Sequence, residues 1–296
     1  MNVNPVPEFL KEKLNTQYGE EIAARIVAGY AQARPVTLRV NTLKTSVSAV
    51  CAALSDCGIP FREVPWFRDA LVLGGAREEE IRKTALYERG EIYLQSLSSM
   101  LPPLFLGAKE GESVLDMTAA PGGKTTEISA LTGGRAFITA CEKDGIRAER
   151  LKYNLEKQGA PRVSVLCEDA TKLDEFFSFD RILLDAPCSG SGTLDLRAPL
   201  KISPKLVANC AALQKKLLAK ALRLLKKGGT LVYSTCSVLR EENEEVLQSV
   251  LPRSGCVCEP IAPFDDLPLL PTATGTICVA PTALYEGFFV ARIKKG

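Results

Sequence analysis

Short apolar runs alternate with amphipathic stretches from residue 113 to the C-terminus. Six runs have the length and composition of buried strands, and they span residues 113–117, 135–141, 162–167, 181–185, 229–234 and 287–293. Apolar positions recur at helical spacing between them, in residues 124–132, 145–158, 204–227 and 241–250. This repeated strand–helix order predicts a parallel sheet covered by helices on both faces. The last run follows a loop-rich stretch, so that strand is free to enter antiparallel.

The first part of the chain has a different pattern. Helices are expected at residues 8–14, 20–33 and 46–57 and a strand at 36–41, with short strand-like pieces near Leu71 and Ile92. No internal repeat or low-complexity linker interrupts the chain. The pattern therefore predicts a small α+β domain over residues 1–107 and an α/β domain over residues 108–296.

Composition places the chain among ordinary globular proteins. Of its 296 residues, 46% are hydrophobic and 24% are charged, which excludes disordered and fibrous classes. No window is apolar over the roughly 18 residues that a membrane helix needs, and the N-terminus lacks the basic start and apolar run of a signal peptide. We therefore expect a cytoplasmic protein that does not enter a membrane.

Cysteine and histidine usage narrows the chemistry. The ten cysteines are scattered without a Cys-x-x-Cys pair, and the chain contains no histidine. A disulfide framework, the Cys/His zinc sites and all histidine-based catalytic triads are therefore not expected, and we predict no metal site. Catalysis would have to use carboxylates, lysines or thiols.

The net charge of +2 conceals a one-sided segment. Ten basic residues and no acidic residue lie between Leu196 and Arg240. One interpretation is the solvated face of an amphipathic helix, because apolar positions recur opposite the lysines. The other is a surface for a polyanion such as nucleic acid, and the pattern alone leaves both interpretations open.

A glycine-rich turn, DMTAAPGGKTT over residues 116–126, follows the first run of the predicted sheet and leads into a helix. A strand, a glycine turn and a helix N-terminus suit the polar end of a nucleotide-like ligand. A P-loop would need glycine at the position of Thr118, and the dinucleotide fingerprint G-x-G-x-x-G is absent. The remaining candidate is an adenosyl ligand held by Gly122 and Gly123.

Acidic residues follow four successive predicted strands. They are Asp116, Glu142, Asp169 and Asp185. Because the carboxyl ends of parallel strands meet at one edge, these acids are expected to line one crevice. Glu142 lies about 20 residues beyond the turn, which is the usual spacing of an acid that binds ribose hydroxyls. Each acid taken singly would more often be a helix cap.

Two cysteines lie in polar loops at the same predicted edge. Cys188 is in DAPCSGSGT, residues 185–193, and Cys236 is in YSTCS, residues 233–237. Turn-forming residues surround both, whereas a packing cysteine needs no such loop. Four others are assigned to packing: Cys141, Cys167, Cys210 and Cys278.

With these motifs the sequence resembles the Sun/RsmB family of S-adenosylmethionine-dependent RNA cytosine-C5 methyltransferases. The similarity covers about residues 34 to 294 and rests on DMTAAPGGKT, DAPCSGSGT, YSTCS and the terminal GFFVARIKK. Upstream, RVNTLK at 39–44 and QSLSS at 95–99 are similar to the family's RNA-binding region. The resemblance implies a Rossmann-like class I methyltransferase fold with a mostly parallel seven-stranded sheet, preceded by a small α+β RNA-binding domain.

The resemblance also implies roles for individual residues. Cys236 would add to C6 of cytosine, Cys188 would assist release, and Asp185 would bind the base edge. S-adenosylmethionine would contact Thr118, Ala119, Ala120, Pro121, Gly122, Gly123, Lys124, Glu142, Arg147, Asp169 and Asp185. Contacts to RNA, either rRNA or tRNA, would come from Arg39, Arg197 and Lys201, and the protein would act as a monomer.

Two alternatives stay open from the residues alone. Chemistry does not choose between Cys236 and Cys188 as nucleophile, because DNA cytosine-C5 methyltransferases use the Pro-Cys thiol. A non-catalytic RNA-binding relative would keep the basic segment and lose one thiol.

The sequence departs from the family at Asp195, where a basic residue is common, and at Thr282, where histidine is frequent. With a last residue at Gly296, we also expect less RNA-binding apparatus than in longer relatives.

Overall fold

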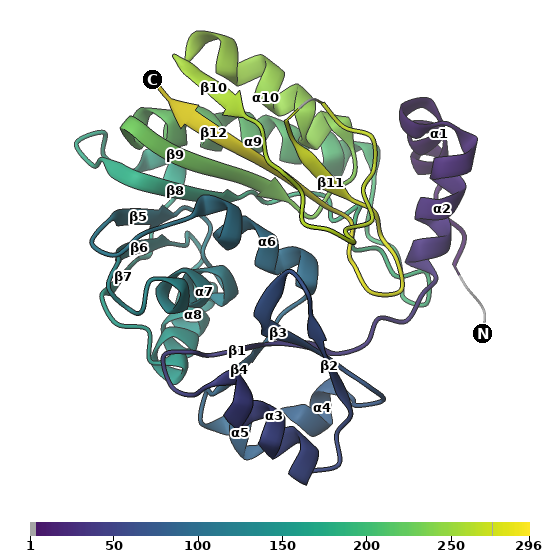
Figure 1. Ribbon diagram of the computed structural model, residues 1–296. Coiled ribbons are helices and arrows are strands. Elements are labelled where there is room, and N and C mark those ends of the chain that lie inside the picture. The colour runs from purple at the N-terminus through teal and green to yellow at the C-terminus, as the bar shows by residue number, and fades with distance from the viewer. Residues whose placement is uncertain (1–3, 274) are drawn as a thin grey trace. The chain divides into compact units, whose positions relative to one another are not determined.

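The computed structural model describes residues 4–273 and 275–296 and divides into two compact units (Figure 1). Unit 1 comprises Met1–Arg34 and Leu184–Gly296, and unit 2 comprises Pro35–Leu183. This division differs from the expected domains over residues 1–107 and 108–296, which stay a prediction. Among the described residues, each helix is too short or too polar to cross a bilayer.

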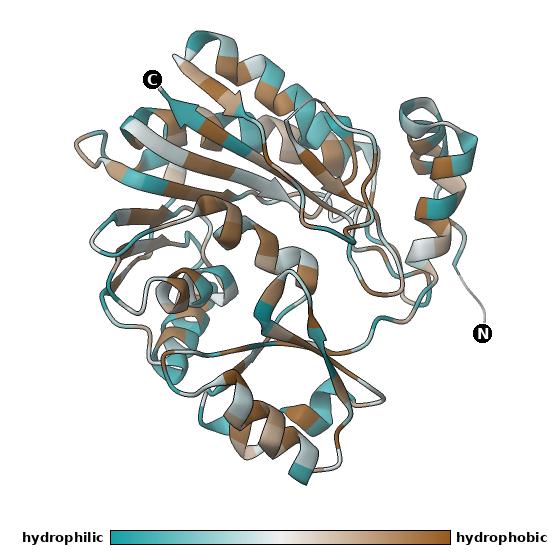
Figure 2. Cartoon of the chain, viewed as in Figure 1, coloured by the Kyte–Doolittle hydropathy of each residue, from teal (hydrophilic) through white to brown (hydrophobic). Residues whose placement is uncertain are grey.

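The N-terminal half of unit 2 is a small antiparallel sheet with helices on one side. Its strands, in the order β2-β3-β1-β4, are β1 (Thr37–Val40), β2 (Phe61–Val64), β3 (Phe67–Leu73) and β4 (Ile92–Leu94). The helices are α3 (Val47–Asp56), α4 (Glu78–Ile81) and α5 (Ala85–Glu88). Leu38, Val50 and Leu71 lie in the core between them, and Figure 2 colours much of α3 as hydrophobic. The predicted small α+β unit is confirmed.

The other half of unit 2 is built from parallel strands. Their order is β8-β5-β6-β7, with β5 (Ser113–Asp116), β6 (Phe137–Cys141), β7 (Val163–Leu166) and β8 (Phe179–Asp185). The helices are α6 (Leu97–Leu106), α7 (Gly123–Leu131) and α8 (Gly145–Gln158), and a 3₁₀ turn η1 (Ala170–Lys172) follows β7. These strands and helices confirm the predicted βα units. Strand β8 runs from unit 2 into unit 1, at Leu184.

Unit 1 joins the first helices of the chain to its C-terminal third. The helices are α1 (Glu8–Tyr18), α2 (Glu20–Tyr30), α9 (Pro204–Leu224) and α10 (Glu244–Val250), with 3₁₀ turns η2 (Arg240–Glu242) and η3 (Leu251–Arg253). The strands are β9 (Leu225–Thr235), β10 (Cys256–Glu259), β11 (Ile277–Val279) and β12 (Phe288–Lys295). Strand β12 pairs antiparallel with β9, which agrees with the loop-rich stretch that precedes β12. Both strands carry hydrophobic bands in Figure 2.

Helix α9 illustrates how local signals set an element's limits. Ser203 caps its start by accepting the N–H of Leu206, and Pro204 occupies the first turn, where its missing N–H costs nothing. The amphipathic pattern predicted a helix to residue 227, but the chain becomes extended at Leu225 and continues as β9. The pattern runs too far because Lys226 and Lys227 fit a helix face equally well.

Candidate functional site

The glycine turn of unit 2 has the strand–turn–helix geometry predicted from the sequence. Strand β5 ends at Asp116, and α7 begins at Gly123. Gly122 has φ of 107°, a conformation that side chains rarely adopt, and a Cβ there would lie 2.9 Å from Leu151 Cδ1. A Cβ at Gly123 would lie 3.0 Å from the ring of Tyr93. Gly122 is therefore required by its backbone conformation, and a side chain at Gly123 would force the Tyr93 ring to shift.

Three of the four predicted acids follow the adjacent strands β5, β6 and β7. Asp116 is buried and accepts a hydrogen bond from Thr125 Oγ1 at 2.7 Å. Glu142 is only 4% exposed and accepts the N–H of Asp144 at 3.0 Å. Asp169 caps η1. The structure thus places these three acids on neighbouring strand ends, each with a local hydrogen-bond partner. Asp185, the fourth predicted acid, lies in unit 1.

The hydrogen bonds of Asp169 affect its ionisation. Thr171 donates both its hydroxyl, at 2.8 Å, and its backbone N–H, at 2.9 Å, to Asp169 Oδ1. The side-chain hydrogen bond, followed by the backbone one, lowers the pKa of Asp169 below its ordinary value. Asp169 is therefore an ionised acceptor at neutral pH.

Two basic residues fix the turn from either side. Arg147 Nη1 lies 3.2 Å from Glu142 Oε2, and Arg147 Nη2 donates to the Ala120 carbonyl at 2.8 Å. The guanidinium thereby ties the acid after β6 to the glycine turn. Lys124 Nζ donates to Ser99 Oγ at 2.8 Å, so this member of the QSLSS segment supports α7.

Arg39 requires a correction to its predicted contact with RNA. Its side chain is 1% exposed and donates to Thr126 Oγ1 at 3.0 Å and to Gln95 Oε1 at 3.3 Å. Glu127 Oε2 lies 3.9 Å from Arg39 Nε. Arg39 and Gln95 therefore connect β1 and the QSLSS segment to α7, and the buried guanidinium has no surface for a phosphate.

The two loop thiols of unit 1 lie together. Cys188 follows β8 and Cys236 follows β9, and their sulfurs are 3.0 Å apart, with both cysteines free. The hydrogen bond to Cys236 and, next, burial raise the pKa of Cys188 well above its ordinary value. Cys188 is therefore protonated at neutral pH and can donate its S–H to the Cys236 sulfur.

Asp185, the fourth predicted acid, belongs to the same unit as the two thiols. It is the last residue of β8, and Ser234 Oγ on β9 donates to its Oδ1 at 2.8 Å. The neighbouring hydrogen bond from the N–H of Ala186 to the Ser234 carbonyl, at 2.8 Å, fixes the end of β8 beside β9. Two neighbouring strands therefore fix the Asp185 carboxylate: β8 carries it, and β9 supplies the hydroxyl that it accepts.

The four cysteines assigned to packing differ in exposure. Cys141 and Cys278 are buried, Cys210 is half-buried, and Cys167 is exposed. Packing was the wrong assignment for Cys167. It follows β7, the edge strand of the parallel set, and lies in the loop that leads to η1.

The basic segment is interrupted in the structure. Lys201, Lys205 and Lys216 are exposed, whereas Lys220 is 6% exposed because it lies among the core-facing positions of α9. Burial therefore removes Lys220 from the candidate phosphate contacts of the basic segment. Arg197 forms an ion pair with Asp195, with Nη2 and Oδ2 2.7 Å apart, and this hydrogen bonding lowers the pKa of Asp195 to about 2. The departure at Asp195 thus partly neutralises Arg197.

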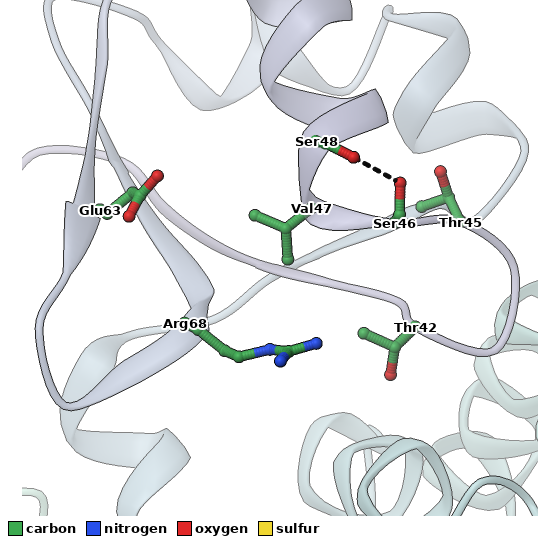
Figure 3. A pocket seen from close by; sticks show the side chains of 7 residues that line it. All are labelled: Thr42, Thr45, Ser46, Val47, Ser48, Glu63 and Arg68. Atoms are coloured by element: carbon green, nitrogen blue, oxygen red, sulfur yellow. Dashed lines mark hydrogen bonds between the residues drawn. The ribbon is translucent and has the colours of Figure 1, made fainter.

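A separate pocket lies at the start of α3 in unit 2 (Figure 3). Its lining consists of Thr42, Thr45, Ser46, Val47, Ser48, Glu63 and Arg68. Ser46 caps α3 and is 3.0 Å from the Ser48 hydroxyl. No residue predicted to bind the cofactor or to act in catalysis lines this pocket, but Thr42 belongs to the RVNTLK motif that resembles the family's RNA-binding region.

The sequence pattern also does not single out Glu242. It belongs to a run of acids after the Cys236 loop that is typical of the exposed first turn of a helix. In the structure its carboxylate is buried and accepts hydrogen bonds from Ser189 and Ser237, the residues that follow the two thiols.

Comparison with known proteins agrees with this arrangement. A profile for 16S rRNA methyltransferase RsmB/F matches residues 103–294, and one for a RsmF/B-like ferredoxin-like domain matches residues 6–78. The chain is 36% identical over 303 residues to ribosomal RNA small subunit methyltransferase F of Vibrio vulnificus, with 98% of this chain and 64% of that protein covered. It is 38% identical over 278 residues to the same enzyme of Aeromonas hydrophila, covering 88% and 57%. The chain therefore spans less than two thirds of the length of these curated relatives.

Solved structures give the same result. A methyltransferase homologue from Pyrococcus horikoshii has a TM-score of 0.87 and 34% identity, covering 98% of this chain and 96% of that one. NSun6 from Pyrococcus horikoshii, solved with SFG, has a TM-score of 0.89, covers 98% of each chain and is 24% identical, a likeness that shows the fold alone. The α/β fold and the family resemblance predicted from the motifs are confirmed. The chain belongs to the 16S rRNA methyltransferase RsmB/F family.

Proposed function

We propose that this chain is an S-adenosylmethionine-dependent RNA cytosine-C5 methyltransferase that acts in the cytoplasm as a monomer on ribosomal or transfer RNA. The observation that carries the proposal is the pair of free thiols, Cys188 and Cys236, with sulfurs 3.0 Å apart. Carbon 5 of cytosine is a poor nucleophile until a thiolate adds to carbon 6, so the reaction needs a thiol. The names of the curated relatives, which specify small-subunit ribosomal RNA, favour rRNA. In this proposal residues 1–107 bind RNA and residues 108–296 catalyse the reaction.

The residues of the glycine turn fit an adenosyl cofactor. Gly122 and Gly123 leave the start of α7 without side chains, where backbone N–H groups favour acceptor atoms of a ligand. Glu142 offers the carboxylate that ribose hydroxyls require, and Arg147 holds it at the turn. The other proposed contacts are Thr118, Ala119, Ala120, Pro121, Lys124, Asp169 and Asp185. When bound, S-adenosylmethionine supplies an activated methyl group.

Cys236 is the proposed nucleophile. Its thiol gives its proton to solvent, its sulfur forms a bond to carbon 6, and the electron pair of the C5–C6 double bond moves to carbon 5 and makes it nucleophilic. After carbon 5 gains the methyl group, it gives its proton to a water molecule, the double bond reforms, and the C6–S bond breaks to return the thiolate. Cys188, protonated and 3.0 Å away, is suited to stabilise the Cys236 thiolate by donating a hydrogen bond, and is proposed to assist the final release.

Asp185 is proposed to bind the edge of the target base. Its carboxyl group would accept a hydrogen bond from the exocyclic amine and share a proton with N3, which offsets the negative charge that develops there as the thiolate adds. The hydrogen bond from Ser234 holds Oδ1 in place for this role. The base must leave its stack or lie in a loop, which costs a few kcal/mol, roughly, that phosphate contacts can offset.

The function is tested by incubating the purified protein with a small-subunit rRNA transcript and S-adenosylmethionine labelled in its methyl group. Nuclease digestion is expected to give labelled 5-methylcytosine from the wild type and none from Cys236→Ala. Cys258→Ala, a change at a half-buried thiol on β10, serves as the control and is expected to keep activity. Label on the exocyclic nitrogen, or on a base other than cytosine, would rule out the proposal.

The cofactor site gives a first prediction. Glu142→Ala removes the carboxylate from the end of β6, and the affinity for S-adenosylmethionine is expected to fall by about 10- to 100-fold, the usual value of hydrogen bonds to a charged group. Isothermal titration calorimetry measures the change. Glu149→Gln, at an exposed position of α8, is the control. Unchanged affinity in Glu142→Ala, or tight binding of ATP by the wild type, would contradict the assignment.

RNA contacts give a second prediction. If Lys201, Lys205 and Lys216 meet phosphates, replacing each by alanine should reduce the slope of log affinity against log salt by ~0.7 to 0.9. Lys152→Ala, an exposed change on α8, is the control. Filter-binding titrations at several salt concentrations measure the slopes. An unchanged slope in all three variants would mean that the basic segment is a solvated helix face and does not contact phosphates.

A further inference from the structure

Glu242 is a buried carboxylate with an unusual number of donors around it. Its side chain, at the end of η2, is 0% exposed. Oε1 accepts the backbone N–H of Ser189 at 2.7 Å, and Oε2 accepts the hydroxyls of Ser189 and Ser237, both at 2.6 Å. Burial of a carboxylate is unfavourable unless strong hydrogen bonds replace its water, and these three short bonds do so.

The two serines place this carboxylate between the thiol loops. Ser189 directly follows Cys188, and Ser237 directly follows Cys236, so one side chain holds a residue of each loop. The loops are also joined by the N–H of Gly192, which donates to the Cys236 carbonyl at 2.9 Å. Ser191 Oγ lies 2.7 Å from Ser237 Oγ. The sulfurs of the two loops are 3.0 Å apart.

Glu242 is itself held from two further elements. Tyr233 on β9 donates its hydroxyl to the Glu242 backbone carbonyl at 2.5 Å. Gln214 on α9 donates to the Pro187 carbonyl at 2.9 Å, and its Nε2 lies 3.5 Å from Glu242 Oε1. The carboxylate thus has a fixed position relative to the strand and helix that carry the loops, which is what a positioning residue requires.

We propose that Glu242 is a positioning residue that holds the Cys188 and Cys236 sulfurs within hydrogen-bonding distance of each other. It acts through Ser189 and Ser237, whose hydroxyls donate to its carboxylate. The catalytic consequence rests on the proposed function, whereas the distance between the sulfurs does not. A carboxylate suits the position because both of its oxygens accept from the surrounding donors, whereas glutamine offers a single acceptor oxygen.

The charge of Glu242 has a second effect on the pair. Together with the hydrogen bond to Cys236 and burial, its negative charge raises the pKa of Cys188. A thiolate is therefore disfavoured at Cys188, which keeps that thiol as the hydrogen-bond donor. Removing the charge and the tether together should loosen the geometry of the pair and bring the pKa of Cys188 closer to its ordinary value.

The test measures sulfur proximity directly. Purified full-length protein is treated with diamide, a two-electron oxidant whose nitrogen–nitrogen double bond takes up the two electrons and two protons released as the thiols form a disulfide. Mass spectrometry of proteolytic fragments, after alkylation of the remaining thiols, follows the linked Cys188–Cys236 peptide. Glu242→Ala is expected to slow its formation by about tenfold or more, because the loops lose their common anchor. Glu245→Gln, at an exposed position of α10, should match the wild type.

Partial unfolding is detected in the same samples. Cys278 is 1% exposed in unit 1 and should resist alkylation while the fold is intact. If Glu242→Ala exposes Cys278, the Ser237→Ala variant, which keeps the carboxylate but loses the Cys236-loop donor, takes its place with the same expectation. Wild-type linking rates in a variant that still protects Cys278 would overturn the proposal.

Methylation gives the second readout. Glu242→Ala is expected to lower kcat by about 10- to 100-fold with little change in KM for RNA, and Glu242→Gln, which keeps one acceptor, should recover part of the loss. A merely structural role would lower activity in proportion to the folded fraction and leave kcat per folded molecule unchanged. If the wild type methylates no cytosine, the proposed function fails, while the linking rates still decide the role of Glu242.

Discussion

Cys236→Ala is expected to bind RNA without ever forming a covalent bond, whereas Cys188→Ala is expected to accumulate a protein–RNA adduct. The physical reason is that the two thiols act at different steps: one adds to the base and the other assists its release. Methylation should fall by at least about 1,000-fold in Cys236→Ala, the usual scale for loss of a nucleophile. Denaturing electrophoresis with labelled RNA and S-adenosylmethionine measures the adduct as a slowly migrating band.

The structure supports one assignment of roles to the two thiols, a choice that residue types alone leave open. The raised pKa of Cys188 favours its protonated form, which suits this thiol to donate a hydrogen bond rather than to attack. Cys210→Ala, a half-buried change on α9, is the matched control and should behave as the wild type. An adduct in Cys236→Ala would exchange the two assignments. Intact methylation in both variants would exclude a thiol mechanism.

The parts of the site that could be predicted are those whose conformation depends on residues close together in the sequence. The glycine turn could be predicted because Gly122 must adopt a positive φ immediately before α7, whatever surrounds it. The two thiol loops could be predicted because each follows a recognisable buried strand. Parallel pairing then brings strand ends to one edge without any knowledge of side-chain contacts.

The residues that could not be predicted are charged side chains buried by distant partners. Arg39, Lys220 and Glu242 all belong to segments whose pattern suggests an exposed face. Whether such a side chain is buried depends on partners far along the chain, as when Arg39 meets Thr126 and Ser189 meets Glu242. No period of 2 or 3.6 residues encodes these pairings.

Short strands were missed for a related reason. Cys256–Glu259 forms β10 and Ile277–Val279 forms β11, both in a stretch whose sequence pattern predicts a loop. Each pairs with β12, and this pairing rather than β propensity determines their conformation. A strand of three or four residues carries too few alternating positions to be distinguished from a loop.

The buried cluster beside the glycine turn should make stability depend on pH. Glu127 on α7 is fully buried, with Gln95 Nε2 2.7 Å from its Oε2 and Arg39 Nε at 3.9 Å. Burial raises the pKa of Glu127 to about 8, against the smaller opposing effect of the Arg39 charge. The carboxyl is therefore mostly protonated at neutral pH, a state in which desolvation is less costly.

Glu127→Gln is accordingly expected to become more stable, relative to the wild type, as the pH rises. The unfolded chain releases the Glu127 proton near its ordinary pKa of 4.5 and the folded chain near 8, so the wild type loses stability across that window, while glutamine does not titrate. At about 1.4 kcal/mol per pKa unit, the difference in free energy of unfolding between variant and wild type should change by roughly 3 kcal/mol from about pH 5.5 to about pH 8. Urea denaturation followed by circular dichroism at both pH values measures it, with the exposed Glu149→Gln as the control for loss of charge. A difference that stays constant with pH would mean that Glu127 is ionised throughout and that its charge pairs fully with Arg39, because only a carboxyl that holds its proton in the folded state can link stability to pH in this range.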